Sequence, residues 1–95
     1  MDDVAEGGDR LLKSLNLAFQ AEWQDISKDR GARIALPRIA SGEPVHRGLS
    51  RAESKAATDA LGRLVRDGIV RRAGRGRYLL GEALFAEWLR MTVSA

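Results

Sequence analysis

The stretch from Ser50 to Leu80 constrains the fold most, because a capped helix pattern runs directly into a glycine-rich hairpin pattern. Ser50 and Glu53 have the spacing of the N-cap and N3 residues of a capping box. The residues up to Asp67 are mostly good helix formers, and Gly68 can end the helix in a left-handed conformation. The sequence therefore predicts a helix that begins after Ser50 and ends at Gly68.

This predicted helix has one apolar face and one polar, largely basic face. At about 100° per residue, the apolar side chains cluster on one side and the charged ones on the other. The apolar side holds Ala57, Leu61, Leu64 and Val65, and the opposite side holds Arg51, Lys55, Asp59, Gly62 and Arg66.

Two short strands are predicted after the helix, over residues 69–72 and 77–80. The four residues between them, Ala73-Gly74-Arg75-Gly76, contain the glycines that a tight hairpin needs for positive φ. The hairpin pattern is rich in arginine, so its turn and strands are predicted to be basic.

Positive charge is concentrated in this part of the chain. The whole chain carries a net charge of +3, whereas residues 46–77 contain nine Lys and Arg against three Asp and Glu, a net charge of +6. Such a cluster is typical of a nucleic-acid-binding surface. The alternative is a solvated arginine-rich surface with no ligand.

The same region resembles a known family. The join from Leu64 to Arg71 is similar to the L-x-x-x-G-hydrophobic-hydrophobic join of winged helix-turn-helix domains. Residues 74–90, GRGRYLLGEALFAEWLR, resemble the ending of the winged-helix domain appended to AAA+/STAND-type ATPases. That family usually has an Asp-Pro pair where this chain has Gly81-Glu82-Ala83. The resemblance spans roughly residues 23–90 and implies an ATPase core in the parent chain.

Pattern and resemblance together predict an α+β fold, a winged helix-turn-helix of three or four helices with a two-stranded β-hairpin wing. We expect residues 1–8, which are acidic and small, to form a disordered tail or linker, and residues 9–92 to form the winged-helix domain. The expected order is helix, helix, short turn, recognition helix, hairpin, helix.

The other elements are predicted from helical spacing. A first helix is expected over about residues 10–25, with Phe19 and Trp23 in the core, and a second over about residues 28–40 with Ser27 as its cap. Pro37 predicts a kink or an early end in the second helix. Residues 41–49 are expected to form a single turn or a loop, and a last helix is expected over about residues 82–91.

Several functional classes are disfavoured by what the sequence lacks. It has no cysteine, a single histidine (His46), no P-loop, no dinucleotide fingerprint and no nucleophile–base pair, so we expect no enzyme, no cofactor and no metal site. Glu22, Asp25 and Asp29 are interpreted as a solvated helix face. No run approaches the length of a membrane span, and the acidic N-terminus lacks signal-peptide features, so a cytoplasmic location is expected.

The first functional hypothesis is a DNA-binding module, an appendage of a larger P-loop ATPase. The recognition helix would enter the major groove of double-stranded DNA, and the wing would bind phosphates or an adjacent minor groove. Gly62 would let the helix approach the DNA backbone closely. The candidate nucleic-acid-binding residues are Arg51, Ser54, Lys55, Thr58 and Arg66 on the helix, and Arg72, Arg75 and Arg77 on the wing.

The second hypothesis is a regulatory protein–protein interaction module that packs on an ATPase core or a partner subunit. The side of the last helix that carries Phe85 and Trp88, together with Trp23, would then be an interface. Exposed tryptophans would favour this hypothesis, and buried ones would favour a free-standing module.

Overall fold

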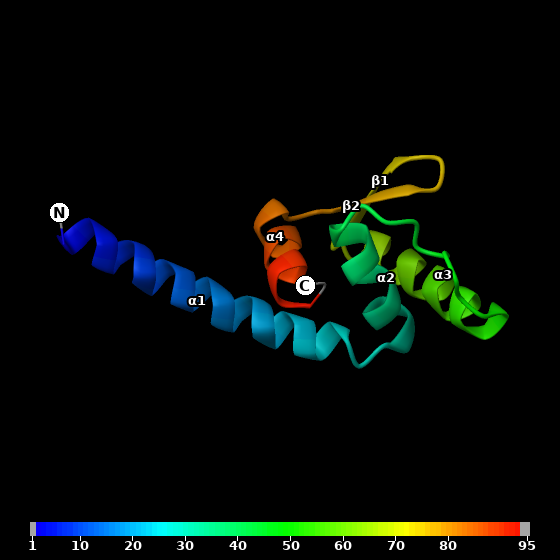
Figure 1. The fold of residues 1–95 in the computed structure, drawn as a ribbon. Coiled ribbons are helices and arrows are strands. Elements are labelled where there is room, and N and C mark those ends of the chain that lie inside the picture. The colour runs from blue at the N-terminus through cyan, green and yellow to red at the C-terminus, as the bar shows by residue number, and fades with distance from the viewer. Residues whose placement is uncertain (1, 94–95) are drawn as a thin grey trace.

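A computed structural model describes the backbone of residues 2–93 and the side chains of residues 14–93. Within that range it contains four helices and one two-stranded antiparallel hairpin (Figure 1), which confirms the predicted α+β class and is consistent with a winged-helix layout. The elements are α1 (Asp2–Ile26), α2 (Arg30–Ala40), α3 (Arg51–Arg66), β1 (Val70–Gly74), β2 (Arg77–Leu80) and α4 (Ala83–Thr92).

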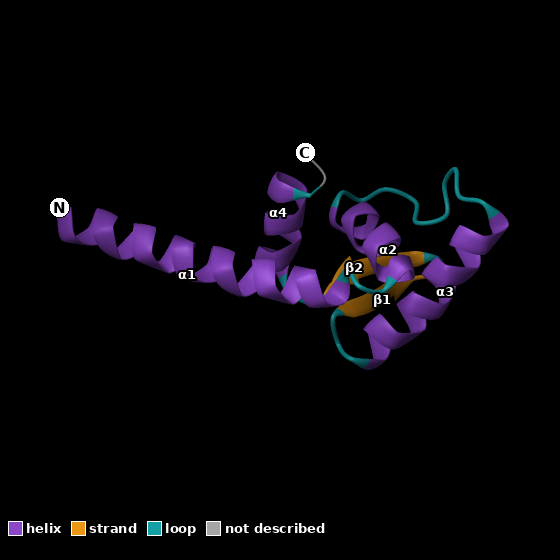
Figure 2. Cartoon of the chain, turned by 90° about the horizontal axis from the view of Figure 1, so that it is seen from below, coloured by secondary structure: helices purple, strands orange, loops and turns teal. Residues whose placement is uncertain are grey.

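Helices α2 and α3 form the closest pair, and the hairpin packs against both of them (Figure 2). The core lies where α2, α3, α4 and the hairpin meet, and its largest fully buried side chains are those of Phe85, Leu36, Leu89 and Val70. Hydrophobic burial of this kind is the main source of stability in a domain of this size.

Helix α1 is joined to α4 by an aromatic cluster. Phe19 is buried as predicted, and its ring centroid lies 5.3 Å from that of Phe85 and 6.2 Å from that of Trp88. The indole Nε1 of Trp88 donates a hydrogen bond of 2.7 Å to Oδ1 of Asn16. The half-buried Trp23 packs against the same core.

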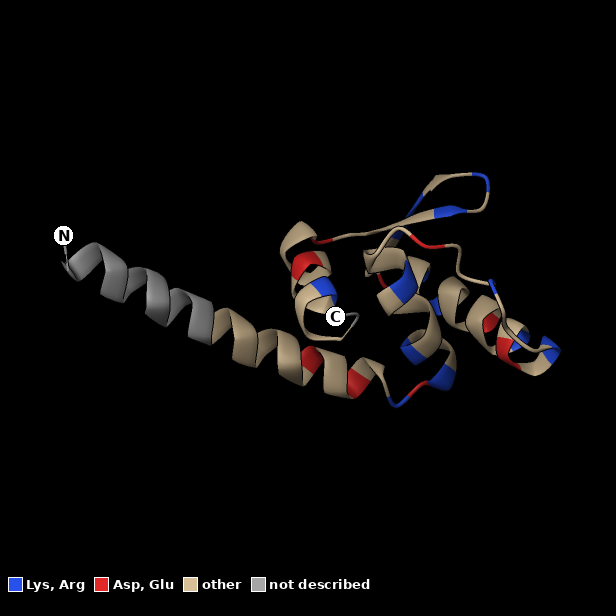
Figure 3. Cartoon of the chain, in the orientation of Figure 1, with Lys and Arg blue, Asp and Glu red and all other residues tan. Residues whose placement is uncertain are grey.

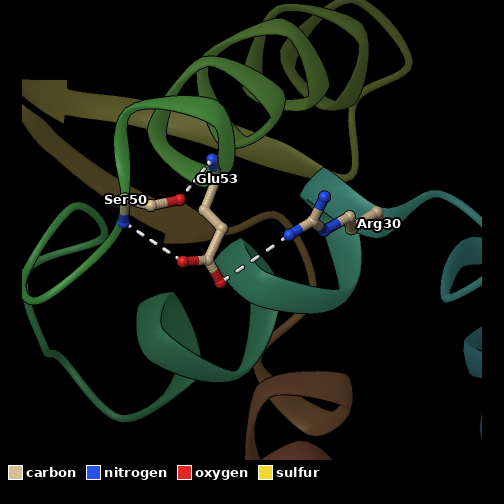
Figure 4. Close-up of polar contacts among 3 residues, drawn as sticks. All are labelled: Arg30, Ser50 and Glu53. Atoms are coloured by element: carbon tan, nitrogen blue, oxygen red, sulfur yellow. Dashed lines mark hydrogen bonds and ion pairs between the residues drawn. The ribbon is translucent and has the colours of Figure 1, made fainter.

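Both ends of α3 follow the local sequence signals. Ser50 Oγ accepts from the Glu53 backbone N–H, and Glu53 Oε1 accepts from the Ser50 N–H, each at 3.1 Å, so the capping box is confirmed (Figure 4). At the other end Gly68 has φ +79°, and the backbone N–H of Ile69 donates to the Leu64 carbonyl. This pattern is a Schellman motif, which requires a left-handed residue at the position of Gly68.

The start of α2 differs from the prediction. Asp29, not Ser27, is the N-cap: its carboxylate accepts from the Gly31 N–H at 3.0 Å. Ser27 instead donates its hydroxyl to the Gln24 carbonyl at 3.3 Å, because α1 continues to Ile26 and leaves Ser27 in the turn after it.

Of the two alternatives predicted at Pro37, a kink or an early end, the early end does not occur, because α2 continues past Pro37 to Ala40, where helical spacing placed its end. Residues 41–50 contain no helix; they form a loop with turns at residues 41–42 and 45–48, in line with the single turn or loop that was predicted. This loop is held by Arg38, whose guanidinium donates to the carbonyls of Val45 and Arg47.

Of the two terminal helices, α4 agrees with the prediction and α1 is longer than predicted. Helix α4 covers Ala83–Thr92, close to the expected range, and Glu82 is its N-cap without a side-chain capping bond. Helix α1 begins at Asp2, earlier than the expected start near Arg10. The side chains of residues 1–13 lie outside the described part of the chain, and the assignment of residues 1–8 to a tail or linker stays a prediction.

The hairpin register pairs Val70 with Leu80, Arg71 with Leu79, and Arg72 with Tyr78. A bulge at Ala73 shifts the register, so that Gly74 pairs with Arg77. Gly76 in the turn has φ +71°, which explains the need for glycine at this position.

Candidate nucleic-acid interface

The exposed face of α3 is the one that the helical period predicted. Ala57, Leu61 and Leu64 are buried against α2 and the hairpin. The five residues predicted for the outer face are all exposed: Arg51, Lys55, Asp59, Gly62 and Arg66. The helical repeat therefore places these five positions on the side of α3 that faces away from the core.

Two contacts between α2 and α3 hold this face in place. The Asp29 carboxylate at the start of α2 pairs with the Arg63 guanidinium, and Arg30 Nη2 lies 4.0 Å from Glu53 Oε2 (Figure 4). Partial burial raises the pKa of Asp29, but the Arg63 hydrogen bond and charge, together with the backbone N–H groups of α2, outweigh burial and lower that pKa overall. Asp29 is thus ionised at neutral pH and ties the two helices together.

The remaining cations of α3 and the wing differ from Arg63. Within residues 14–93, ion pairs form at Lys28, Arg30, Arg63 and Arg90. The candidate cations are absent from that set: Arg51, Lys55, Arg66, Arg72, Arg75 and Arg77. All six are exposed (Figure 3 shows Lys and Arg along the hairpin and at the start of α3). These guanidinium and ammonium groups are free to meet an external anion.

The two candidate hydroxyls, of Ser54 and Thr58, form hydrogen bonds with other groups of the chain. Ser54 Oγ lies 2.7 Å from Nδ1 of His46, and Thr58 Oγ1 donates to the Ser54 carbonyl at 3.0 Å. The histidine, expected as a surface residue, is exposed and links the loop of residues 41–50 to α3. The sequence carried no signal for this contact, since it depends on how the loop closes.

The N-terminus of α3 is already occupied by a carboxylate. The backbone N–H of Ser50 donates to Glu53 and, together with the Ser50 side chain, lowers the pKa of this exposed carboxyl group. The N-terminus of a helix carries a partial positive charge and free backbone N–H groups, which can bind a phosphate. The Glu53 carboxylate already balances part of that charge and accepts the Ser50 N–H. A phosphate bound at this end would therefore depend on the side chains of Arg51 and Lys55 more than on backbone donors.

The wing arginines do not share one face. Side chains alternate along each strand, so Arg72 lies on the hairpin face of Val70 and Tyr78, whereas Arg77 lies on the opposite face with Arg71 and Leu79. Arg75 belongs to the turn. The sequence hypothesis grouped Arg72, Arg75 and Arg77 as a single phosphate-binding set, and the register separates them.

Other site types have little support in the described residues. No group of three or more His, Cys, Asp or Glu side chains within them is arranged to hold a metal ion. None of the helices, in the part of the chain that was searched, is both long and apolar enough to cross a membrane.

No protein-family model matches the chain, and no curated protein or solved structure is significantly similar to it.

Proposed function

We propose that this chain is a DNA-binding winged-helix module, with α3 as the recognition helix and the hairpin as the wing. The observation that carries the proposal is that the six candidate cations of α3 and the wing, together with Arg71, are exposed and form no ion pair within residues 14–93. A cluster of exposed cations is suited to binding a polyanion such as DNA.

In this proposal α3 lies in the major groove with its first two turns toward the DNA. Arg51 and Lys55 are exposed there and reach base edges or phosphates, while Arg66 meets the backbone at the far end. Gly62 adds no side chain to the outer face, and an added Cβ would meet nothing within 4 Å, so this face has room for a close DNA backbone. Ser54 and Thr58 contribute by orienting the helix surface through their internal hydrogen bonds.

A titration of a labelled random-sequence duplex, followed by fluorescence anisotropy at several salt concentrations, tests the proposal. If about four to six cations meet phosphates, log K should fall against log salt with a slope of roughly −4 to −5. The double variant Arg51→Ala/Lys55→Ala should bind more weakly than the parent.

The matched control is Arg33→Ala, which removes an exposed cation from α2, outside residues 46–77. It should bind DNA like the parent. Absence of binding at low salt, or equal losses in the control and the double variant, would refute a DNA interface on α3.

We also propose, from the family resemblance alone, that the module is an appendage of a P-loop ATPase and acts in the cytoplasm. The test is the coding sequence next to this one: a P-loop ATPase in the same reading frame supports the proposal, and its absence argues against it.

The alternative proposal, a regulatory module that packs on an ATPase core or a partner subunit, draws on a different surface. Leu84 and Met91 are 58% and 70% exposed and lie seven residues apart on α4, hence on one side of that helix, and Trp88 beside them is only half-buried. If this surface is the interface, Leu84→Ser/Met91→Ser should abolish binding to the partner subunit in sedimentation experiments and leave DNA titrations unchanged.

A further inference from the structure

A groove runs along the hairpin on the side of Leu79. Two adjacent hollows of about 280 and 460 Å³ share Ile39, Gly42 and Leu79, and together they extend from the hairpin turn to α4. Their size is comparable with sites for small ligands, roughly 300–1,000 Å³. One wall is the end of α2 with the loop after it, and the other wall is the hairpin.

The hairpin wall of this groove presents an apolar side chain with cations beside it. Leu79 is 48% exposed, although its neighbour Leu80 is only 8% exposed and supplies the core contact of β2. By the register, Arg71 lies opposite Leu79 and Arg77 lies two residues before it, on the same face. Neither arginine has an ion pair within residues 14–93, so an apolar side chain is flanked by two available positive charges.

The backbone of β2 adds a second binding element. The sheet has only two strands, so β2 keeps one edge without a strand partner. Because the Gly81 N–H donates to the Ile69 carbonyl, the alternation of an antiparallel ladder directs the peptide groups of Tyr78 and Leu80 toward that edge. An extended peptide can pair with such an edge.

We propose that this groove binds an extended segment of a partner protein in which acidic residues flank an apolar one. The apolar residue covers Leu79, and the carboxylates pair with Arg77 and Arg71. A nucleic acid fits these observations less well, because phosphates gain nothing from an exposed leucine. Glu43 also lines the groove and opposes an acidic ligand, so the acidic residues should lie toward the hairpin wall. Arg90 is engaged with Glu87 and the Ala40 carbonyl and is not counted.

The test is a selection of random seven-residue peptides, displayed on phage, against the full chain. The expected consensus has an apolar residue with Asp or Glu two positions to either side. Selected peptides, synthesised with a fluorescent label, should bind Leu79→Ser about thirtyfold more weakly, the smallest loss that defines an interface hot spot. A repeat selection on Arg71→Glu/Arg77→Glu should yield basic residues at the flanking positions.

Arg33→Glu is the matched charge reversal, because Arg33 is exposed on α2 and does not line the groove. It should bind the selected peptides like the parent, and hydrogen exchange should show protection of the Tyr78 and Leu80 amides when peptide is added. No consensus, a basic consensus on the parent, or peptides that bind Leu79→Ser like the parent would overturn the proposal. Loss of DNA binding in Leu79→Ser with no peptide consensus would assign the groove to DNA instead.

Discussion

Gly31 brings the backbones of α2 and α3 close together, so Gly31→Ala tests the packing that positions α3. An added Cβ would lie 2.0 Å from the Ala56 carbonyl oxygen and 2.8 Å from the Ala60 Cβ. Contacts of a real Cβ are essentially never shorter than 3.0 Å, so the two backbones must separate by about 1 Å. The Ala56 carbonyl oxygen belongs to the backbone of α3, so it cannot shift without moving the helix.

The size of the effect follows from two opposing contributions. Overpacking a closely packed interior costs about 1–3 kcal/mol. Replacing glycine by alanine inside a helix stabilises the folded state by roughly 0.5–1 kcal/mol. A backbone clash belongs at the upper end of the overpacking range, so the net loss should be about 2–2.5 kcal/mol. For a domain of this length that lowers Tm by about 8–20 °C.

Gly62→Ala is the matched control, because it is also a helical glycine but its added Cβ would meet nothing within 4 Å. It should raise the free energy of unfolding by about 0.5–1 kcal/mol. Thermal unfolding followed by far-UV circular dichroism measures both variants. If Gly31→Ala melts at or above the parent while Gly62→Ala behaves as expected, the α2–α3 packing described above is wrong. Gly62→Ala should also weaken DNA binding, since it adds a methyl group to the proposed contact face.

Further variants test the buried core, the N-cap of α3 and the carboxyl group of Glu22. Leu64→Ala should cost about 2–5 kcal/mol in urea unfolding, because Leu64 is buried. The exposed Arg66→Ala should change stability by less than about 0.5 kcal/mol, and equal losses in the two variants would contradict the helix phase. Ser50→Ala removes the N-cap acceptor and should cost about 1 kcal/mol, whereas a neutral result would mean that the capping box does not stabilise α3. Partial burial and the Glu82 carboxylate raise the pKa of Glu22 above its ordinary value of 4.5, so ionisation is harder in the folded chain and stability falls as pH rises through this range. Glu22→Gln should therefore be more stable than the parent at neutral pH, with a gain that shrinks below pH 4.5; a gain that persists in acid would have another cause.

Helix α3 could be predicted because its signals are local. The capping box, the apolar spacing and Gly68 all lie within or next to the helix, and each depends on the backbone of α3 itself. The start of α2 could not be predicted in the same way. Ser27 and Asp29 are both good capping residues two positions apart, and the carboxylate is favoured by its pairing with Arg63, which is distant in sequence.

The candidate interface was predicted in part, for a related reason. Exposure of Arg51, Lys55 and Arg66 follows from helical period, whereas the engagement of Ser54 by His46 follows from a loop conformation that no periodic pattern reports. The capping box was predicted, yet its consequence for the helix end was not: the Glu53 carboxylate takes the position that an external anion would use.

The sequence could not predict which face of the wing is buried, because Leu79 and Leu80 are adjacent and chemically alike. Alternation of apolar and polar residues shows which strand face is buried, and two consecutive leucines give no such signal. The structure pairs Leu80 with Val70 in the core, and this register places Arg77 on the face opposite Arg72. With Leu79 inward instead, Arg72 and Arg77 would share a face. A combined wing variant would therefore remove cations from two surfaces at once, and only separate substitutions of Arg72 and Arg77 can distinguish a phosphate contact from the peptide groove.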